Sequence, residues 1–265
     1  MNNKVALIYD FDKTLSPKDM QEYGFFKMIN VEEPSEFWDE VKELSIKNKM
    51  DSILTYMYVM LKRYPNLKKQ DLIEAGSKIQ LYDGVLEWFD RINKYGQDKG
   101  LIIEHYIISS GLQEMINGTK IQQYFNKIYA CSFYYDNDLV KWPARVVNYT
   151  TKTQYLFRIN KGILDESNDI DLNKATKEEQ KYIPFENMIY IGDGFTDVPC
   201  MKIVKANNGY TIAVYDNNVD KLAKQLLDDK RAMFITSANY KENAPIDIIV
   251  KKILDLINIK NNLYK

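Results

Sequence analysis

Short apolar runs recur along the chain, and each ends in a polar cluster of turn-forming residues. The clearest runs are Val5–Tyr9, His105–Ile108, Met188–Ile191 and Tyr210–Val214. Continuous apolar runs of this length are typical of strands that are buried on both faces of a parallel sheet. The chain is therefore expected to build such a sheet.

Apolar residues at helical spacing fill the intervals between these runs. The stretches 84–94, 219–227 and 246–257 show this spacing most clearly. Alternating strands and helices predict a doubly wound, Rossmann-like α/β fold with a parallel sheet. Right-handed crossovers place the carboxyl ends of the strands at one edge, where such sheets bind ligands.

Residues 16–81 interrupt this alternation. Their apolar positions, especially from Pro34 to Leu61, have helical spacing and no strand pattern. We expect a helical cap inserted directly after the first strand, with residues 1–15 and 82–265 forming the α/β core. A cap at this point lies over the edge of the sheet where the polar clusters gather.

Two later segments also depart from the alternation. Between Tyr129 and Val147 the residues alternate in polarity around Asp136-Asn137-Asp138, which is typical of a hairpin. The stretch from Leu164 to Lys181 is polar and rich in charge, and it predicts an excursion over the surface.

Composition and charge exclude some classes of partner. Hydrophobic residues make up 45% of the 265 residues, and 36 basic residues balance 37 acidic ones. No strongly basic stretch marks a nucleic-acid polymer as partner, and no run approaches the roughly 18 apolar residues of a membrane span. We expect a soluble, cytoplasmic protein with reduced Cys131 and Cys200 that acts on a small molecule. The oligomeric state stays open.

Candidate chemistry begins where the first strand ends, in Asp10-Phe11-Asp12-Lys13-Thr14. Carboxylates two residues apart on an extended chain project to the same side. Two neighbouring acids repel each other, and a divalent cation relieves that repulsion. An ordinary acidic turn at a strand end also explains this short motif, because five residues match by chance easily.

A second motif, Ser109-Ser110-Gly111, lies between a predicted strand and a helix that starts near Leu112. Hydroxyl groups and free amides at a helix N-terminus form an anion site. Capping of the helix by either serine is an equally good explanation, so this motif decides little alone.

The third motif, Gly192-Asp193-Gly194-Phe195-Thr196-Asp197, is the most specific. Asp193 ends a buried strand between two glycines, which allow the backbone to turn sharply. Asp197 follows one helical turn later, where it can contact a metal or hold a ligand of that metal. All three motifs follow predicted parallel strands, so we expect them to meet at one edge of the sheet.

With these motifs, the sequence resembles the haloacid dehalogenase (HAD) superfamily of phosphohydrolases, and most closely its phosphoserine phosphatase-like branch. The order of elements matches over nearly the whole chain, although the specific motifs are short. The family's opening motif falls on Asp10, Asp12 and Thr14, its second motif on Ser109, and its fourth on Gly192–Asp197. A helical cap after the first motif is the architecture of one subclass.

The resemblance implies a Mg²⁺-dependent phosphatase that forms an aspartyl phosphate on Asp10, with Asp12 as general acid and base. It implies Mg²⁺ ligation by Asp10, the backbone carbonyl of Asp12, and Asp193. Phosphate binding then falls to Ser109, Ser110 and Lys152, and a supporting role to Thr14 and Asp197. For the family's lysine we favour Lys152, just before a helix expected near Gln154, over Lys161 at the far end of that helix.

The substrate is open. Phosphoserine phosphatases carry a glutamate after the first motif and an arginine in the cap. The nearest candidates here are Asp19, Glu22 and Arg63, and the match is inexact. Nucleotide monophosphates, sugar phosphates and phosphorylated amines or alcohols therefore remain candidates besides phosphoserine.

Two alternatives to hydrolysis also remain: phosphotransfer to an acceptor other than water, and an inactive binding module of the same fold. Retention of both Asp10 and Asp12 argues against the inactive module. Ion-pumping ATPases carry a related Asp-Lys-Thr string, but the absence of predicted membrane spans excludes that class.

Overall fold

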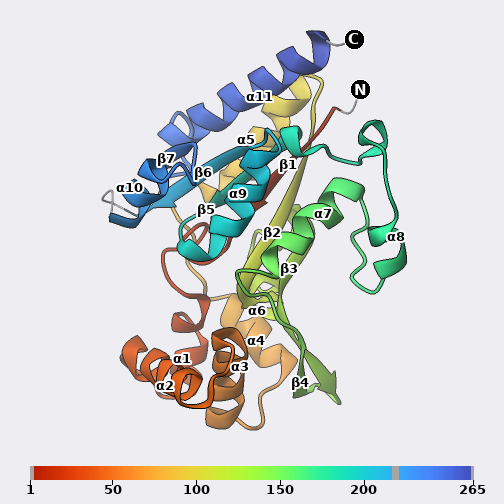
Figure 1. The fold of residues 1–265 in the computed structure, drawn as a ribbon. Coiled ribbons are helices and arrows are strands. Elements are labelled where there is room, and N and C mark those ends of the chain that lie inside the picture. Colours follow the sequence, from red (N-terminus) through yellow and green to blue (C-terminus); the bar gives the residue numbers. More distant parts are fainter. Residues whose placement is uncertain (1–2, 217–220, 264–265) are drawn as a thin grey trace.

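A computed structural model describes residues 3–216 and 221–263 (Figure 1). Their strands form one seven-stranded sheet with the order β4-β3-β2-β1-β5-β6-β7. All neighbouring strands are parallel except β3 and β4. The strands are β1 (Lys4–Tyr9), β2 (Ile102–Leu112), β3 (Phe125–Asp136), β4 (Leu139–Arg145), β5 (Met188–Gly192), β6 (Tyr210–Tyr215) and β7 (Phe234–Ser237). The predicted doubly wound α/β fold is confirmed.

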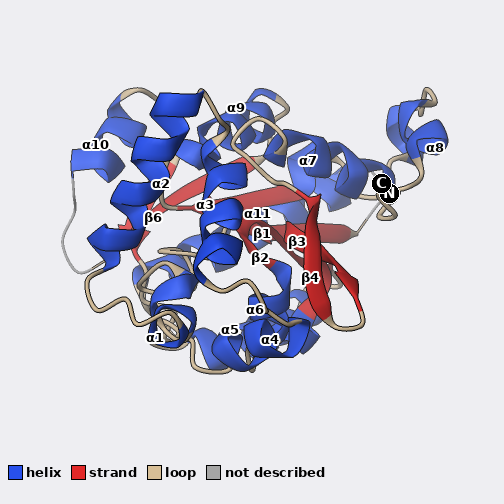
Figure 2. Cartoon of the chain, turned by 90° about the horizontal axis from the view of Figure 1, so that it is seen from below, coloured by secondary structure: helices blue, strands red, loops and turns tan. Residues whose placement is uncertain are grey.

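Helices cover both faces of this sheet (Figure 2). The helices α5 and α11 pack together on one face, and α7 and α9 pack together on the other. The helices are α1 (Phe25–Met28), α2 (Pro34–Asn48), α3 (Ser52–Arg63), α4 (Lys69–Gly76), α5 (Val85–Asp98), α6 (Gln113–Asn117), α7 (Lys152–Lys161), α8 (Asp169–Asn173), α9 (Val198–Ala206), α10 (Lys221–Asp228) and α11 (Pro245–Leu263). Among these described residues no helix is long and apolar enough to cross a bilayer.

The position of β1 explains why the motifs meet. It lies between β2 and β5 and runs parallel to both. Residues Val5 to Tyr9 are fully buried, as the continuous apolar run indicated. The three strands that precede the motifs are therefore adjacent, and their carboxyl ends share one edge.

Several predicted boundaries differ from the structure. The strand predicted at His105–Ile108 is longer, because it continues through the serines to Leu112. The strand β7 has no counterpart in the prediction, since its short sequence is partly exposed at the sheet edge. The predicted hairpin is confirmed as β3 and β4, with left-handed backbone at Asn137 and Asp138 in the turn. The predicted start of the 219–227 helix lies outside the described residues.

The segment 16–81 contains α1 to α4, which gather beyond the carboxyl ends of the central strands (Figure 1). An aromatic cluster of Phe26, Phe37, Trp38 and Tyr56 packs α1, α2 and α3 together. At Gly76, a Cβ atom would lie 1.9 Å from the carbonyl oxygen of Met115, so only glycine allows α4 to approach α6 this closely. The division of the chain into a core and a cap remains a prediction.

His105 lies inside a buried network on β2. Trp88 Nε1 donates to the hydroxyl of Tyr9 at 2.9 Å, and that hydroxyl lies 3.0 Å from His105 Nδ1. On the other side, His105 Nε2 lies 2.9 Å from Asn93 Oδ1. The tautomer assigned from this network accepts at Nδ1 and donates at Nε2, so the ring is neutral. Burial lowers the pKa of His105 to about 3, which indicates a structural role.

We predict that His105 makes the folded protein sensitive to mild acid. In the unfolded chain His105 takes up a proton below its ordinary pKa of 6.5, whereas the folded ring stays neutral down to about 3. Stability is therefore lost as the pH falls below 6.5, by up to about 1.4 kcal/mol per pH unit. In His105→Gln this dependence is absent, so the difference in unfolding free energy between wild type and variant should shrink by about 2 kcal/mol from pH ~7.5 to ~5. Urea denaturation at both pH values measures it, and a constant difference would contradict a neutral buried ring.

Candidate active site

The first motif folds into a tight loop directly after β1. The amide of Asp10 donates to the carbonyl of Ile191 in β5 at 2.9 Å, and Asp10 Oδ1 accepts from the amide of Phe11 at 2.7 Å. Lys13 adopts left-handed backbone with φ of 57°, which reverses the chain. The amide of Leu15 then donates back to the carbonyl of Phe11. These contacts fix a nearly buried Asp10 carboxylate at the sheet edge.

Lys152 is the buried cation of the site. It is the first residue of α7 and is fully buried, and its Nζ lies 2.7 Å from Asp10 Oδ2 and 2.8 Å from Asp197 Oδ1. Burial alone opposes the positive charge, but Asp10 and Asp197 outweigh it and raise the pKa of Lys152 above its ordinary value. Lys152 is therefore charged across the physiological range.

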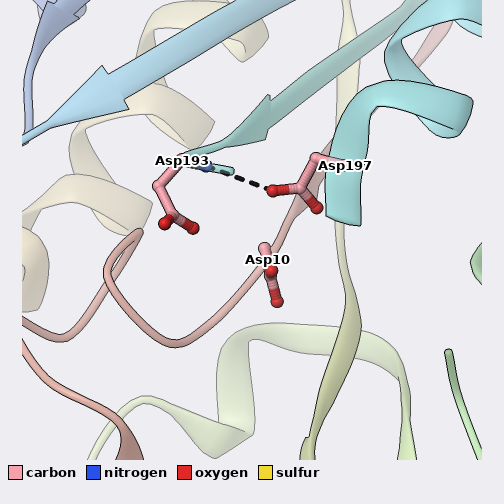
Figure 3. A group of neighbouring side chains, drawn as sticks. All are labelled: Asp10, Asp193 and Asp197. Atoms are coloured by element: carbon pink, nitrogen blue, oxygen red, sulfur yellow. Dashed lines mark hydrogen bonds between the residues drawn. The ribbon is translucent and has the colours of Figure 1, made fainter. Parts of the chain in front are cut away.

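The third motif folds around Asp197 (Figure 3). Asp197 Oδ2 accepts from the amides of Asp193 and Gly194 at 3.2 Å, and Oδ1 accepts from the hydroxyl of Tyr190 at 2.7 Å. A Cβ atom at position 192 would lie 2.5 Å from this carboxylate, so glycine is needed where the loop closes over Asp197. With Lys152 as a further donor, Asp197 acts mainly as a structural anchor.

Asp10, Asp193 and Asp197 form a group that fits a hard divalent cation. One carboxylate oxygen from each lies within 4.8 Å of the others (Figure 3). Burial raises the pKa of Asp10 to about 6; burial and the neighbouring Asp197 raise that of Asp193 well above its ordinary value. Crowded carboxylates of this kind, beside the buried Lys152, match the oxygen ligands that Mg²⁺ prefers. Since Asp197 already accepts from several donors, Asp10 and Asp193 are the carboxylates best able to bind a metal.

Asp12 is oriented differently from Asp10. Its Oδ1 accepts from the amide of Met20 at 2.9 Å, and its Oδ2 lies near Gly111 on the neighbouring strand. Burial, followed by the charges of Asp19 and Asp10, raises the pKa of Asp12 well above its ordinary value. The Asp12 carboxylate is thus separate from the cluster of Asp10, Asp193 and Asp197. Ligation of a metal by the backbone carbonyl of Asp12 stays a prediction.

The second motif places two neighbouring serines near the carboxyl end of β2. Ser109 is buried and its oxygen accepts from the amide of Gly111 at 3.0 Å. The hydroxyl oxygen of Ser110 is buried without a partner among the described residues. Neither serine hydroxyl donates to an acceptor among the described residues.

Other predicted residues lie at varying distances from this centre. The hydroxyl of Thr14 donates to Asp193 Oδ1 at 3.2 Å, and Asp19 pairs with Lys13 at 2.9 Å. Glu22 lies in the short turn after Asp19, where burial and Asp19 raise its pKa. Lys161 donates to backbone carbonyls of residues 172 and 174, and Arg63 pairs with Glu40, so neither lies at the acidic cluster.

Three side chains at the site were not anticipated from the sequence. Tyr190 donates to Asp197, Tyr56 donates to the carbonyl of Ser110 at 2.8 Å, and the sulfur of Met20 accepts from the amide of Leu112. Tyr56 comes from α3 and Met20 from the turn after Asp19. Nothing in the local pattern marks Tyr56 and Met20, because each makes its contact with a distant segment. Tyr190 is seven residues before Asp197 in the same segment, but its place in an apolar run indicates only a buried strand.

The family can now be assigned. Residues 7–202 match the family model of the haloacid dehalogenase-like hydrolases. The chain belongs to this hydrolase family. The described geometry agrees with that assignment, since the matched range holds all three motifs and Lys152.

Comparison with individual proteins gives the same fold. The chain is 32% identical over 278 residues to an uncharacterized protein of Borreliella burgdorferi, covering 92% of this chain and 94% of the relative. A HAD family hydrolase of Salmonella enterica serovar Typhi aligns with a TM-score of 0.60 at 16% identity, covering 95% of this chain and 71% of that one. Phosphoserine phosphatase in its apo form aligns with a TM-score of 0.59 at 16% identity, covering 95% and 98%. A probable phosphoserine phosphatase of Vibrio cholerae aligns with a TM-score of 0.59 at 13% identity, covering 98% and 67%. These structural likenesses establish the HAD-type fold.

We predict opposite effects of Asp193→Asn on the metal-free and the metal-loaded protein. Without metal, the substitution removes the charge of a half-buried carboxylate beside Asp197 and Asp10, so Tm should rise. With Mg²⁺ at about one hundred times its Kd, wild type should gain about 3 kcal/mol of stability, and the variant should gain almost nothing. Calorimetric Tm values with and without MgCl₂ measure both effects. An equal Mg²⁺ response in the two proteins would place the metal elsewhere.

Proposed function

We propose that the protein is a Mg²⁺-dependent phosphatase that hydrolyses a small phosphate monoester through an aspartyl phosphate on Asp10. The observation that carries this proposal is the contact of the buried Lys152 with both Asp10 and Asp197, beside Asp193. A lysine and a cluster of acids at the carboxyl edge of a parallel sheet suit a dianionic phosphate and a divalent cation together. Membership of the hydrolase family supports the proposal.

The reaction begins with Asp10. A carboxylate oxygen of Asp10 attacks phosphorus, so the new O–P bond forms as the bond to the leaving oxygen breaks. Asp12 gives its proton to that leaving oxygen and becomes a carboxylate. The raised pKa of Asp12 supports this role, because burial favours the protonated form that a general acid needs.

The second half of the reaction releases phosphate. Asp12 takes a proton from a water molecule, and the water oxygen attacks phosphorus as the bond to Asp10 breaks. The products are inorganic phosphate and the original Asp10 carboxylate, and Asp12 again carries its proton. The same group thus serves first as acid and then as base.

Charge on the phosphoryl group is balanced by fixed donors. Lys152 and the hydroxyls of Ser109 and Ser110 bind its oxygens, since the two hydroxyl hydrogens are unused and the ammonium is already oriented. Asp10, the carbonyl of Asp12 and Asp193 would hold Mg²⁺, which would supply further positive charge against the repulsion between the Asp10 carboxylate and the phosphate. Thr14 and Asp197 hold Asp193 and Lys152 in place.

The substrate is a small phosphorylated metabolite, and residues 16–81 form the cap that selects it. Asp19 and Glu22 follow the first motif closely and are the cap residues that we assign to the leaving group. Arg63 pairs with Glu40, so it gives no support to phosphoserine as the substrate. The buried, free thiols of Cys131 and Cys200 suit the reducing cytoplasm, where we place the protein.

The first test of this function is Asp10→Asn. The amide cannot form the acyl phosphate, so hydrolysis of p-nitrophenyl phosphate with Mg²⁺ should fall below about a hundredth of the wild-type rate while Tm is retained. Asp12→Asn is the matched control: it keeps the nucleophile, and rapid quenching with mass spectrometry should find phosphate on Asp10. Higher residual activity in Asp10→Asn, or label on another residue, would identify a different nucleophile. Transfer of phosphate to an added alcohol in place of water would identify a phosphotransferase.

The second test separates the two lysines. Lys152→Ala should slow turnover about a hundredfold or more, because contacts that neutralise a reacting phosphate are worth roughly 3–4 kcal/mol. Lys161→Ala should be mild, because Lys161 holds only backbone carbonyls of the surface excursion. Steady-state kinetics of both variants measure the difference. A reversed order of effects would show that the family's lysine has been assigned wrongly.

A further inference from the structure

A segment beyond the family match reaches back into the site. Residues 238–244 connect β7 to α11 and lie after the matched range, which ends at residue 202. Within this segment Tyr240 is completely buried, and its hydroxyl donates to the backbone carbonyl of Thr14 at 2.9 Å. This contact joins the C-terminal part of the chain to the loop that carries Asp10 and Asp12.

The contact continues through Thr14 to a proposed metal ligand. Thr14 is itself fully buried, and its hydroxyl donates to Asp193 Oδ1 at 3.2 Å. Burial, with added contributions from Tyr9 and other neighbours, raises the pKa of Tyr240 well above its ordinary value, so its hydroxyl remains a donor at any physiological pH. The path from Tyr240 through Thr14 to Asp193 thus consists of two directional hydrogen bonds, which join two fully buried residues to the half-buried Asp193.

Tyr240 is held firmly at its own position. Its ring packs edge-on against Trp88 with a centroid distance of 5.2 Å, and its carbonyl accepts from Arg91. Arg91 also donates through Nε to the buried carboxylate of Asp247 at 3.0 Å, in the first turn of α11. Contacts from α5 and α11 therefore hold Tyr240 in place, and Tyr240 in turn holds Thr14.

The same residue touches the junctions of segment 16–81. The amide of Tyr240 donates to the carbonyl of Asp83 at 2.8 Å. Next to it, Gly84 has φ of 81°, and a Cβ atom there would lie 2.4 Å from the carbonyl carbon of Tyr240. The junction at residues 83–84, where the segment ends, therefore packs directly on the Tyr240 backbone. The hydroxyl of Tyr240 holds Thr14, close to the junction where the segment begins.

We propose that Tyr240 is a positioning residue for the metal site: it fixes the backbone of Thr14 so that the threonine hydroxyl holds Asp193 in the orientation that binds Mg²⁺. This inference rests on the proposed function, because it assigns Asp193 as a metal ligand. It adds a residue that lies outside the family match and outside every sequence motif. Its role is indirect, since Tyr240 contacts neither the carboxylates nor the substrate position.

Isothermal titration calorimetry of the full chain with MgCl₂ alone tests the inference without any substrate. Tyr240→Phe keeps the ring against Trp88 and removes only the hydrogen bond to Thr14. Loss of a partner that orients a metal ligand typically weakens binding 10- to 100-fold, and for this more remote contact we expect about tenfold. Tyr129→Phe is the matched control, because the buried Tyr129 also donates to a backbone carbonyl, that of Leu164 at 3.2 Å. The control should bind Mg²⁺ like wild type.

A double-mutant cycle shows whether Tyr240 acts through Thr14. Thr14→Val removes the hydroxyl that reaches Asp193 and should weaken Mg²⁺ binding by itself. If Tyr240 acts through this hydroxyl, adding Tyr240→Phe to Thr14→Val should change the affinity by less than about twofold. Independent tenfold losses would overturn the proposed path. If Tyr240→Phe does not fold, Arg91→Lys loosens the Tyr240 loop with the phenol intact and should weaken Mg²⁺ binding in the same direction.

The outcomes separate this inference from the proposed function. Suppose that the wild-type protein binds Mg²⁺ and hydrolyses the phosphate ester. If Tyr240→Phe then binds Mg²⁺ as tightly as wild type, the role of Tyr240 is overturned and the proposed function stands. An equal loss in Tyr240→Phe and Tyr129→Phe also overturns it, because the effect is then one of general stability. Absence of Mg²⁺ binding in wild type overturns both proposals.

Discussion

The arrangement of the site depends on one buried cation among several carboxylates. Lys152 is completely shielded from solvent and contacts Asp10 and Asp197 at once. A charge buried in this way is tolerated only when it is paired and hydrogen-bonded. The lysine therefore requires both carboxylates to lie within reach of its ammonium group, at the ends of β1 and β5.

This constraint connects parts of the fold that are far apart in sequence. Lys152 can reach Asp10 only because α7 begins at the carboxyl edge of the sheet. Asp197 is in turn oriented by Tyr190 and by the amides of its own loop, so its carboxylate does not need to move to meet the lysine. A preorganised set of charges of this kind is what electrostatic stabilisation of a reacting phosphate requires.

The sequence predicted the fold around the site correctly where acidic residues directly follow a local pattern that specifies a strand or a turn. The apolar run before Asp10 predicted a buried strand, and the glycines around Asp193 predicted a sharp turn, so the meeting of these motifs followed from the rules of parallel sheets. The same reasoning missed β7, whose Phe234 is partly exposed and whose four residues give no clear period. It also missed Tyr56 and Tyr240, because a hydrogen bond from a tyrosine to a distant backbone carbonyl leaves no mark in the local pattern. Residues of that kind are visible only once the packing is known.

The two ends of segment 16–81 lie side by side, since the amide of Tyr82 donates to the carbonyl of Leu15 at 3.0 Å. An insertion whose ends are already joined does not displace the elements that flank it. Its length can therefore vary at little entropic cost. Evolution can therefore lengthen, shorten or exchange this segment as a unit while the sheet and its acidic edge stay the same. The limits on such change lie where the segment touches the rest of the chain away from its ends: at Gly76, which packs on α6, and at Leu67, whose carbonyl accepts from the amide of Val140 in the hairpin.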